Sequence, residues 1–251
     1  MYQYIYDGFL SDQKYDKILT RIESKLTDLD IKGRLHKLTV QRSFENYLKE
    51  IADKKSDCLV IVGNDNTLAK ILNIVVEKNI VLGIIPIGNK NRFADFMGIH
   101  HEEKACETLA ARKIEELDLG KIGGQYFLSS VEVEGEGVSI LCNNKYEIKT
   151  LKGIQKIGIY NLCLEEQIQN IFNPQDGMFE LLSFSKNKKN IFSFKKKELK
   201  ETLIKIKQAK ILSSSKTTSV LVDGSKIIKT PAEVSLAEKK LKIVVGKGRK
   251  F

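Results

Sequence analysis

The sequence has no tryptophan, only three prolines and only four cysteines among its 251 residues. The four cysteines form no C-x-x-C pair, and Cys58 and Cys163 lie in apolar runs that are typical of buried strands. These spacings support neither a zinc site nor a disulfide framework. We therefore expect reduced thiols, as in a cytoplasmic protein.

Long apolar runs are absent as well, and none approaches the ~20 residues that a membrane-spanning helix needs. The segment from Met1 to Asp7 lacks both a basic lead and a long apolar stretch, so we do not expect a secretory signal. Hydrophobic residues make up 42% of the chain, which is enough for a packed core. The sequence thus predicts a cytoplasmic globular protein, with peripheral contact to the inner face of the membrane left open.

Basic residues outnumber acidic ones: Lys and Arg total 42 and Asp and Glu total 32, which gives a net charge of +10. One interpretation is a compositional bias toward lysine. The other is a surface that attracts phosphates, whether of nucleotides, nucleic acid or anionic lipid headgroups. Charge alone leaves both open.

In the first half of the chain, strand and helix patterns alternate. Apolar residues recur at helical spacing over 15–29, 44–51 and 68–76, and β-prone runs occupy 2–6, 58–62 and 80–86. The run 58–62 is apolar throughout, as in a central parallel strand covered on both faces. This order predicts an α/β N-terminal domain with a parallel sheet, which we place at residues 1–115.

After residue 115 the pattern changes to many short β-prone runs separated by turn residues, the last of them at Leu241–Val245. We expect residues 116–251 to form a mainly antiparallel β-sandwich, the lipid- or substrate-binding domain. One helix, near 195–207, is expected to interrupt it.

Two loops stand out, each between a predicted strand and a predicted helix. The first comprises Gly63, Asn64, Asp65, Asn66 and Thr67, and the second runs from Pro86 to Ala94. At the carboxyl ends of adjacent parallel strands, backbone N–H groups and helix dipoles point into one crevice, which suits phosphate. An ordinary turn with an asparagine cap on the next helix explains the first loop equally well.

The loops carry a family resemblance. The chain resembles the diacylglycerol kinase catalytic-domain family, including bacterial soluble lipid kinases, which share a fold with NAD kinases. That family reads G-G-D-G-T in the first loop and P-L-G-T-G-N-D, an aromatic residue and alanine in the second. The matching residues are Gly63, Asp65 and Thr67, then Pro86, Gly88, Asn91, Phe93 and Ala94. Later segments that resemble family motifs are 117–120, 174–178 with Glu180, 222–225 and 230–233.

The resemblance implies transfer of the γ-phosphoryl group of ATP to a lipid hydroxyl, such as that of diacylglycerol, with Mg²⁺ as cofactor. It assigns catalysis to Asp65 and Asp223. It also implies a set of nucleotide-contacting residues: Thr39, Gly63, Asn64, Asp65, Asn66, Thr67, Gly88, Asn89 and Asn91. A structural magnesium would be bound by Asp176 with Met178 and Asn173, although an ordinary Asp-Gly turn explains Asp176 equally well.

Several positions depart from the family pattern. Asn64 and Asn66 replace two loop glycines, and Arg92 replaces an aspartate. Ser225 stands where the family has the glutamate proposed as proton acceptor, and the early N-P-x-S-G signature is absent. A serine needs an activating partner before it can act as a base. The alternative is therefore a catalytically impaired relative of the same fold that still binds a nucleotide or lipid.

Some features of the sequence also fit functions other than a lipid kinase. The stretch 186–197 sets aromatics between lysines, which suits either a membrane interface or a solvated face. A nucleic-acid reader would use the same charge, but no recognised motif is present, so we expect no nucleic-acid partner. An NAD kinase would share the first loop without the later motifs. The expected partners are a nucleotide and a lipid substrate at a membrane surface, and the resemblance also allows a homodimer.

Overall fold

A computed structural model describes residues 2–38, 58–150, 154–165, 171–185, 203–214 and 217–251. The chain forms two compact units: residues 1–117 with 239–251 make the first, and residues 118–238 make the second. The expected boundary near 115 lies close to the point where the second unit begins. The expectation that everything after it forms one domain differs from the structure, because the last 13 residues rejoin the first unit.

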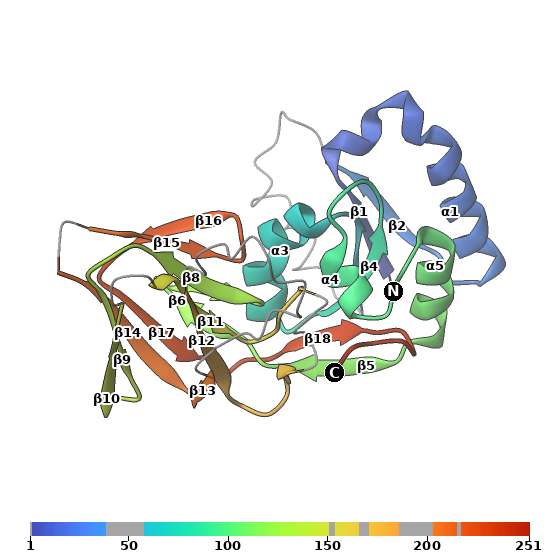
Figure 1. Ribbon diagram of the computed structural model, residues 1–251. Helices are drawn as coiled ribbons and strands as arrows, with labels where there is room; N and C mark the ends of the chain where they lie inside the picture. The colour runs from blue at the N-terminus through green and yellow to red at the C-terminus, as the bar shows by residue number, and fades with distance from the viewer. Residues whose placement is uncertain (1, 39–57, 151–153, 166–170, 186–202, 215–216) are drawn as a thin grey trace, which may run out of the picture. The chain divides into compact units, whose positions relative to one another are not determined.

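The first unit is built on one six-stranded sheet in the order β2-β1-β3-β4-β18-β5 (Figure 1). Its strands are β1 (Tyr2–Tyr6), β2 (Gly33–Lys37), β3 (Cys58–Gly63), β4 (Val81–Pro86), β5 (Ile114–Leu117) and β18 (Leu241–Val244). All neighbours pair in parallel except β18 and β5, which are antiparallel. The predicted parallel sheet is therefore confirmed.

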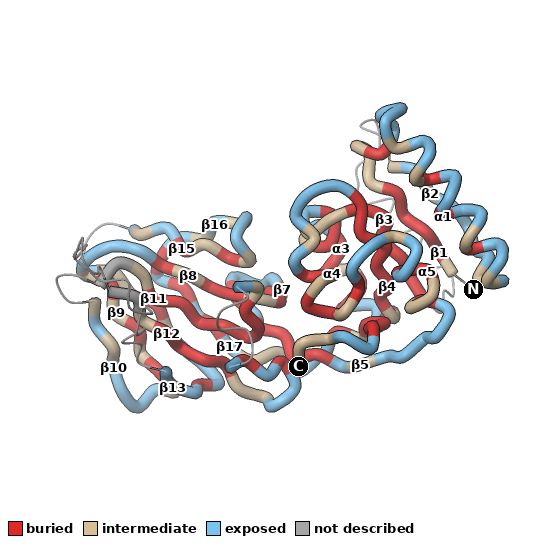
Figure 2. The backbone as a smooth tube through the Cα atoms, turned by 45° about the vertical axis from the view of Figure 1, so that its right-hand side comes forward, coloured by how far each residue is buried: buried red, intermediate tan, exposed pale blue. Residues whose placement is uncertain are grey.

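Helices cover both faces of this sheet: α1 (Asp16–Asp28), α3 (Asp65–Glu77), α4 (Arg92–Phe96) and α5 (Glu102–Ala111). From β1 the chain steps one way along the sheet and from β3 the other way, so right-handed crossovers place α1 and α3 on opposite faces. Figure 1 shows α1 and α5 on one side and α3 and α4 on the other. Every residue of β3 is buried, as the apolar run predicts (Figure 2).

Strand β18 was assigned to the β-sandwich from its sequence, and that prediction was wrong. Ile243 of β18 pairs with Leu82 of β4. The following turn is fixed by the Gly246 N–H, which donates to the Met97 carbonyl at 2.9 Å, and a Cβ at Gly246 would overlap the Gly98 carbonyl. A β-prone sequence predicts that a segment forms a partly buried strand. It does not predict which sheet that strand joins.

The second unit contains two six-stranded antiparallel sheets, ordered β10-β9-β14-β17-β6-β7 and β13-β12-β11-β8-β15-β16. The first sheet holds β6 (Gly120–Ile122), β7 (Gln125–Phe127), β9 (Val138–Cys142), β10 (Tyr146–Lys149), β14 (Gln208–Ser213) and β17 (Ala232–Leu236). The second holds β8 (Ser130–Glu134), β11 (Ile154–Tyr160), β12 (Phe179–Ser185), β13 (Leu203–Ile206), β15 (Ser219–Val222) and β16 (Lys226–Lys229). Side chains from both sheets share one apolar core that includes Phe127, Val131, Ile140 and Phe179. This arrangement confirms the predicted antiparallel sandwich.

The helix expected near 195–207 is wrong where it can be compared. Leu203 and Ile206 lie on β13, and residues 195–202 fall outside the described part of the chain. The spacing of Leu203 and Ile206 fits a helix, but pairing with β12 decides the conformation. The helix expected over 44–51 and the lysine- and aromatic-rich stretch 186–197 also lie outside the described residues. Within the described residues, no helix is long and apolar enough to cross a membrane.

All four cysteines are buried and none forms a disulfide. Burial of Cys58 and Cys163 was expected from the apolar runs around them. Burial raises the pKa of the Cys106, Cys142 and Cys163 thiols to about 11. A raised thiol pKa means less thiolate at neutral pH, and thiolate is the reactive form.

We predict that a thiol reagent at pH 8 labels the native protein at least about tenfold more slowly than the urea-unfolded protein. Mass spectrometry measures the rate of labelling. Rapid labelling of the native protein would contradict this burial.

Candidate functional site

The two loops predicted to share a crevice do lie together, at the carboxyl ends of β3 and β4. The Ile87 N–H donates to the Gly63 carbonyl at 2.8 Å, and the Asp65 N–H donates to the Lys90 carbonyl at 3.0 Å. The first bond extends the β3–β4 pairing beyond the strands, and the second joins the loops themselves. The predicted adjacency is therefore confirmed.

Asp65 connects the loops through its carboxylate as well. Its Oδ2 accepts from the Arg92 N–H at 3.1 Å and its Oδ1 from the Phe93 N–H at 3.2 Å, at the first turn of α4. Burial raises the pKa of the Asp65 carboxyl, while the two backbone N–H bonds oppose that rise. Asp65 was predicted to act on phosphate or magnesium. In this structure both of its oxygens bind backbone N–H groups of the second loop.

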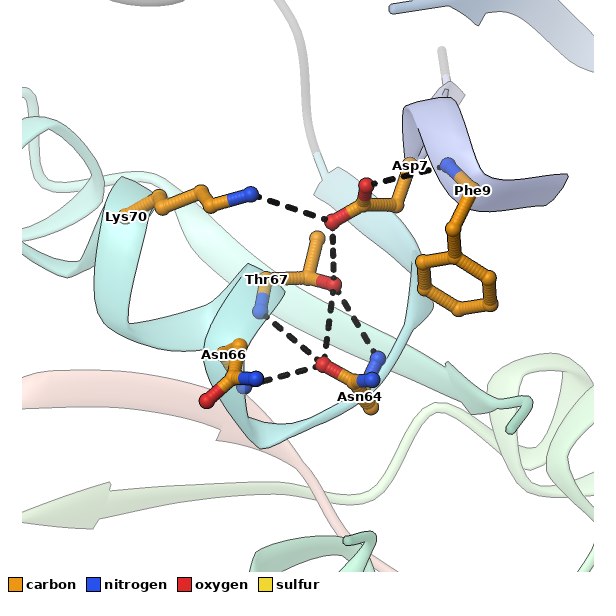
Figure 3. Close-up of polar contacts among 6 residues, drawn as sticks. All are labelled: Asp7, Phe9, Asn64, Asn66, Thr67 and Lys70. Atoms are coloured by element: carbon orange, nitrogen blue, oxygen red, sulfur yellow. Dashed lines mark hydrogen bonds and ion pairs between the residues drawn. The ribbon is translucent and has the colours of Figure 1, made fainter. Parts of the chain in front are cut away.

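The N-terminus of α3 is capped by its own residues (Figure 3). Asn64 Oδ1 accepts from the N–H groups of Asn66 at 3.0 Å and Thr67 at 3.4 Å, and Thr67 Oγ1 accepts from the Asn64 N–H at 3.1 Å. This is a reciprocal capping box. Together with the Asp65–Lys90 bond, it gives every backbone N–H from Asn64 to Thr67 a partner within the protein. The asparagine-cap interpretation, left open by the sequence, is the one that the structure contains.

Asp7 joins this cluster from the end of β1, and the sequence reasoning missed it. Thr67 Oγ1 donates to Asp7 Oδ2 at 2.7 Å, and the Lys70 ammonium lies 3.5 Å from the same oxygen (Figure 3). The Asp7 side chain is only 11% exposed. Its position, directly after a buried parallel strand, was the available signal, because strand ends converge at one edge of the sheet.

The second loop is held in shape by glycine geometry and by Asn91. Gly88 has a φ of +82°, and a Cβ there would lie 3.3 Å from the Phe9 ring. Asn91 Nδ2 donates to the Gly88 carbonyl at 2.8 Å. Asn89, Lys90 and Arg92 are exposed. The loop therefore presents two cationic side chains to solvent where the family pattern has an acidic one.

Asp223 lies in the turn between β15 and β16, in the second unit, with a φ of +47°. Its carboxylate accepts hydrogen bonds from the N–H groups of Leu128 (2.9 Å), Ser129 (2.7 Å) and Ser130 (3.1 Å), and from Ser129 Oγ (2.9 Å). These bonds hold the β7–β8 connection. Ser225, two residues on, is exposed. The carboxylate predicted to act in catalysis thus has a structural role in the second unit.

The residues predicted to bind a structural magnesium form a turn. Asp176 Oδ1 accepts from the Met178 N–H at 3.0 Å, Asn173 Oδ1 accepts from the Gln175 N–H at 3.1 Å, and Asp176 Oδ2 binds the Lys205 ammonium at 2.7 Å. In the described part of the chain no three His, Cys, Asp or Glu side chains gather as a metal site. An ammonium on the principal carboxylate repels a metal ion, so these residues do not fit magnesium as arranged. Thr39 lies outside the described residues.

Comparison with known proteins bears on the same loops. The Diacylglycerol kinase catalytic domain family matches residues 4–122, which include both of them. These residues are similar to that family over slightly less than half of the chain. Diacylglycerol kinase of Bacillus subtilis is 27% identical over 129 residues, and a probable lipid kinase YegS-like protein of Alcanivorax borkumensis is 24% identical over 133 residues. Each match covers 50% of this chain and under half of the relative, 43% and 44% respectively.

Solved structures extend the likeness to the whole fold. A diacylglycerol kinase structure from Bacillus anthracis matches with a TM-score of 0.77 and 19% identity over 98% of this chain and 97% of the other. A putative diacylglycerol kinase from the same organism gives a TM-score of 0.78 at 19% identity, with the same coverage. At this identity the match shows that the two chains share a fold, including the sandwich. What chemistry this chain performs has to be argued from its own residues.

The structural role of Asp223 can be tested by stability. We predict that Asp223→Ala lowers the free energy of unfolding by about 2–4 kcal/mol, because it leaves buried N–H groups unpaired and puts alanine at a positive φ. Asp223→Asn should lose less, because asparagine tolerates that conformation and keeps one acceptor oxygen. Urea unfolding measures both, with exposed Glu238→Ala as the control. Equal stability of Asp223→Ala and the wild type would show that the carboxylate does not hold the turn.

Proposed function

We infer that this chain is a lipid-kinase-like protein that binds the phosphates of ATP at the joined loops and transfers the γ-phosphoryl group to a lipid hydroxyl, such as that of diacylglycerol. The observation that supports this most directly is the pair of hydrogen-bonded loops at the carboxyl ends of β3 and β4. Anionic ligands bind at such edges in parallel α/β sheets. The names of the matched relatives support the same class of reaction.

Three exposed cationic side chains lie on and beside the joined loops. Lys90 and Arg92 are exposed on the second loop, and Lys70 is exposed on α3 next to Asp7. Such side chains neutralise phosphate charge, and an arginine can bind two phosphate oxygens at once. The backbone N–H groups of Asn66 and Thr67 become available only if the Asn64 side chain rotates away. In the described conformation, phosphate would bind these cations. The loop backbone would contribute only after the Asn64 side chain has rotated.

Transfer also requires a base. The lipid oxygen forms a bond to the γ-phosphorus, ADP leaves with the electron pair of the broken bond, and the hydroxyl proton passes to an acceptor. Asp65 and Asp223 are the carboxylates proposed for this chemistry. Magnesium would screen the phosphate charge when it is bound with the nucleotide, and we assign it no residue, because the described residues do not fit it.

A second candidate function is a catalytically impaired relative that binds nucleotide or lipid. The specific observation in its favour is that both proposed carboxylates are engaged. Asp65 accepts two backbone N–H bonds, and Asp223 accepts bonds from three residues. Carboxylate oxygens that already accept these hydrogen bonds have fewer lone pairs left to take up the hydroxyl proton. A peripheral lipid surface and a homodimer remain part of the proposal in either case.

Nucleotide binding is tested by freeing the loop. We predict that Asn64→Gly with Asn66→Gly binds ATP about 3–10-fold more tightly than the wild type, because the N–H groups of the first α3 turn lose their internal acceptor. Glycine is itself an acceptable cap, so the helix should persist. Isothermal calorimetry measures the affinity, and Asn79→Gly, at the opposite end of α3, is the matched control. No ATP binding by any of these proteins would refute the kinase and a nucleotide-binding relative, and would leave only a lipid-binding relative.

Phosphoryl transfer separates the two candidates. The assay uses radiolabelled ATP and a panel of lipids. If the protein is an active kinase, the wild-type protein phosphorylates diacylglycerol or another acceptor. An impaired relative does so only after Ser225→Glu, which supplies a carboxylate where the family has one. If neither protein transfers phosphate while both bind ATP, the kinase proposal fails and nucleotide binding stands alone.

A further inference from the structure

Outside the loops, two acidic side chains of the second unit converge on one lysine. Lys205 on β13 is the cross-strand partner of Glu180 on β12. Its ammonium lies 2.7 Å from Asp176 Oδ2 and 3.8 Å from Glu180 Oε1. One cation thus lies within ion-pair distance of two carboxylates that come from different parts of the chain.

Glu180 is the unusual member of this group. Its side chain is fully buried, and neither of its carboxylate oxygens has a hydrogen-bond partner. A buried carboxylate without hydrogen-bond partners is destabilising unless a cation is close. The Lys205 ammonium is the cation that lies within ion-pair distance of Glu180.

The adjoining segment 173–178 is itself a compact turn. Asp176 Oδ1 accepts from the Met178 N–H, and the Gly177 N–H donates to the buried Asp118 carboxylate at 2.7 Å. The remaining Asp176 oxygen and Glu180 face the same ammonium. Oxygen ligands of this kind, two carboxylates beside a turn, are what hard divalent cations bind.

We propose that the Lys205 ammonium is a built-in cation occupying the position of a metal ion between Asp176 and Glu180, so that this part of the second unit needs no divalent cation. A divalent ion and the ammonium compete for the same oxygens, and the ammonium is tethered by its strand. Metal binding is suppressed while Lys205 is present. It emerges when the positive charge is removed and the carboxylates are kept.

Thermal unfolding with added cations tests this in the full chain. The wild type should show the same Tm in EDTA, 10 mM MgCl₂ and 10 mM CaCl₂. Lys205→Met should unfold at a lower Tm in EDTA and regain at least about 3 °C with one of the two ions. Lys210→Met removes a lysine paired with exposed Glu233 and should show no ion response. The double variant Lys205→Met with Asp176→Asn should lose the response.

Two results would overturn the proposal: ion stabilisation of the wild type equal to that of Lys205→Met, or no ion response of a folded Lys205→Met.

Discussion

The carboxylate of Asp65 is the interaction on which the candidate site depends. It accepts from the Arg92 and Phe93 N–H groups at the start of α4, while the Asp65 N–H donates to the Lys90 carbonyl. Loops that follow different strands are otherwise related only through the sheet, and these bonds fix one against the other. A partly buried carboxylate bonded in this way stabilises a loop pair, and both of its oxygens are already engaged by backbone N–H groups.

The same principle recurs at other motif positions. Asn64 caps α3, Asp223 holds the β7–β8 connection, and Asp176 binds Lys205. Each of these three side chains, which suggest chemistry in the sequence, binds a partner within the chain. The chain thus has the fold of the matched structures, while internal hydrogen bonds and ion pairs engage these polar side chains. A shared fold does not by itself establish a shared reaction.

Sequence patterns within single segments predicted the type of most helices and strands. The buried run of β3, the amphipathic α1 and α3, and the change to short antiparallel strands all follow from periodicity. The sheet that Leu241–Val244 joins and the strand conformation of Leu203–Ile206 did not, because pairing over long sequence separations decides them. In the site, the adjacency of the loops was predictable from strand order. The contribution of Asp7 and the pairing of Lys205 were not, because side-chain partners between distant segments leave no periodic signal.

Native-state hydrogen exchange, read residue by residue by NMR, tests the central claim most directly. The claim is that Asp65 fastens the second loop to the first. The Arg92 and Phe93 amides should then be protected to about the same degree as the amides of β4, although both lie at a helix start where N–H groups ordinarily lack partners. Exchange of these two amides at the rate of exposed loop residues, with β4 protected, would contradict the account.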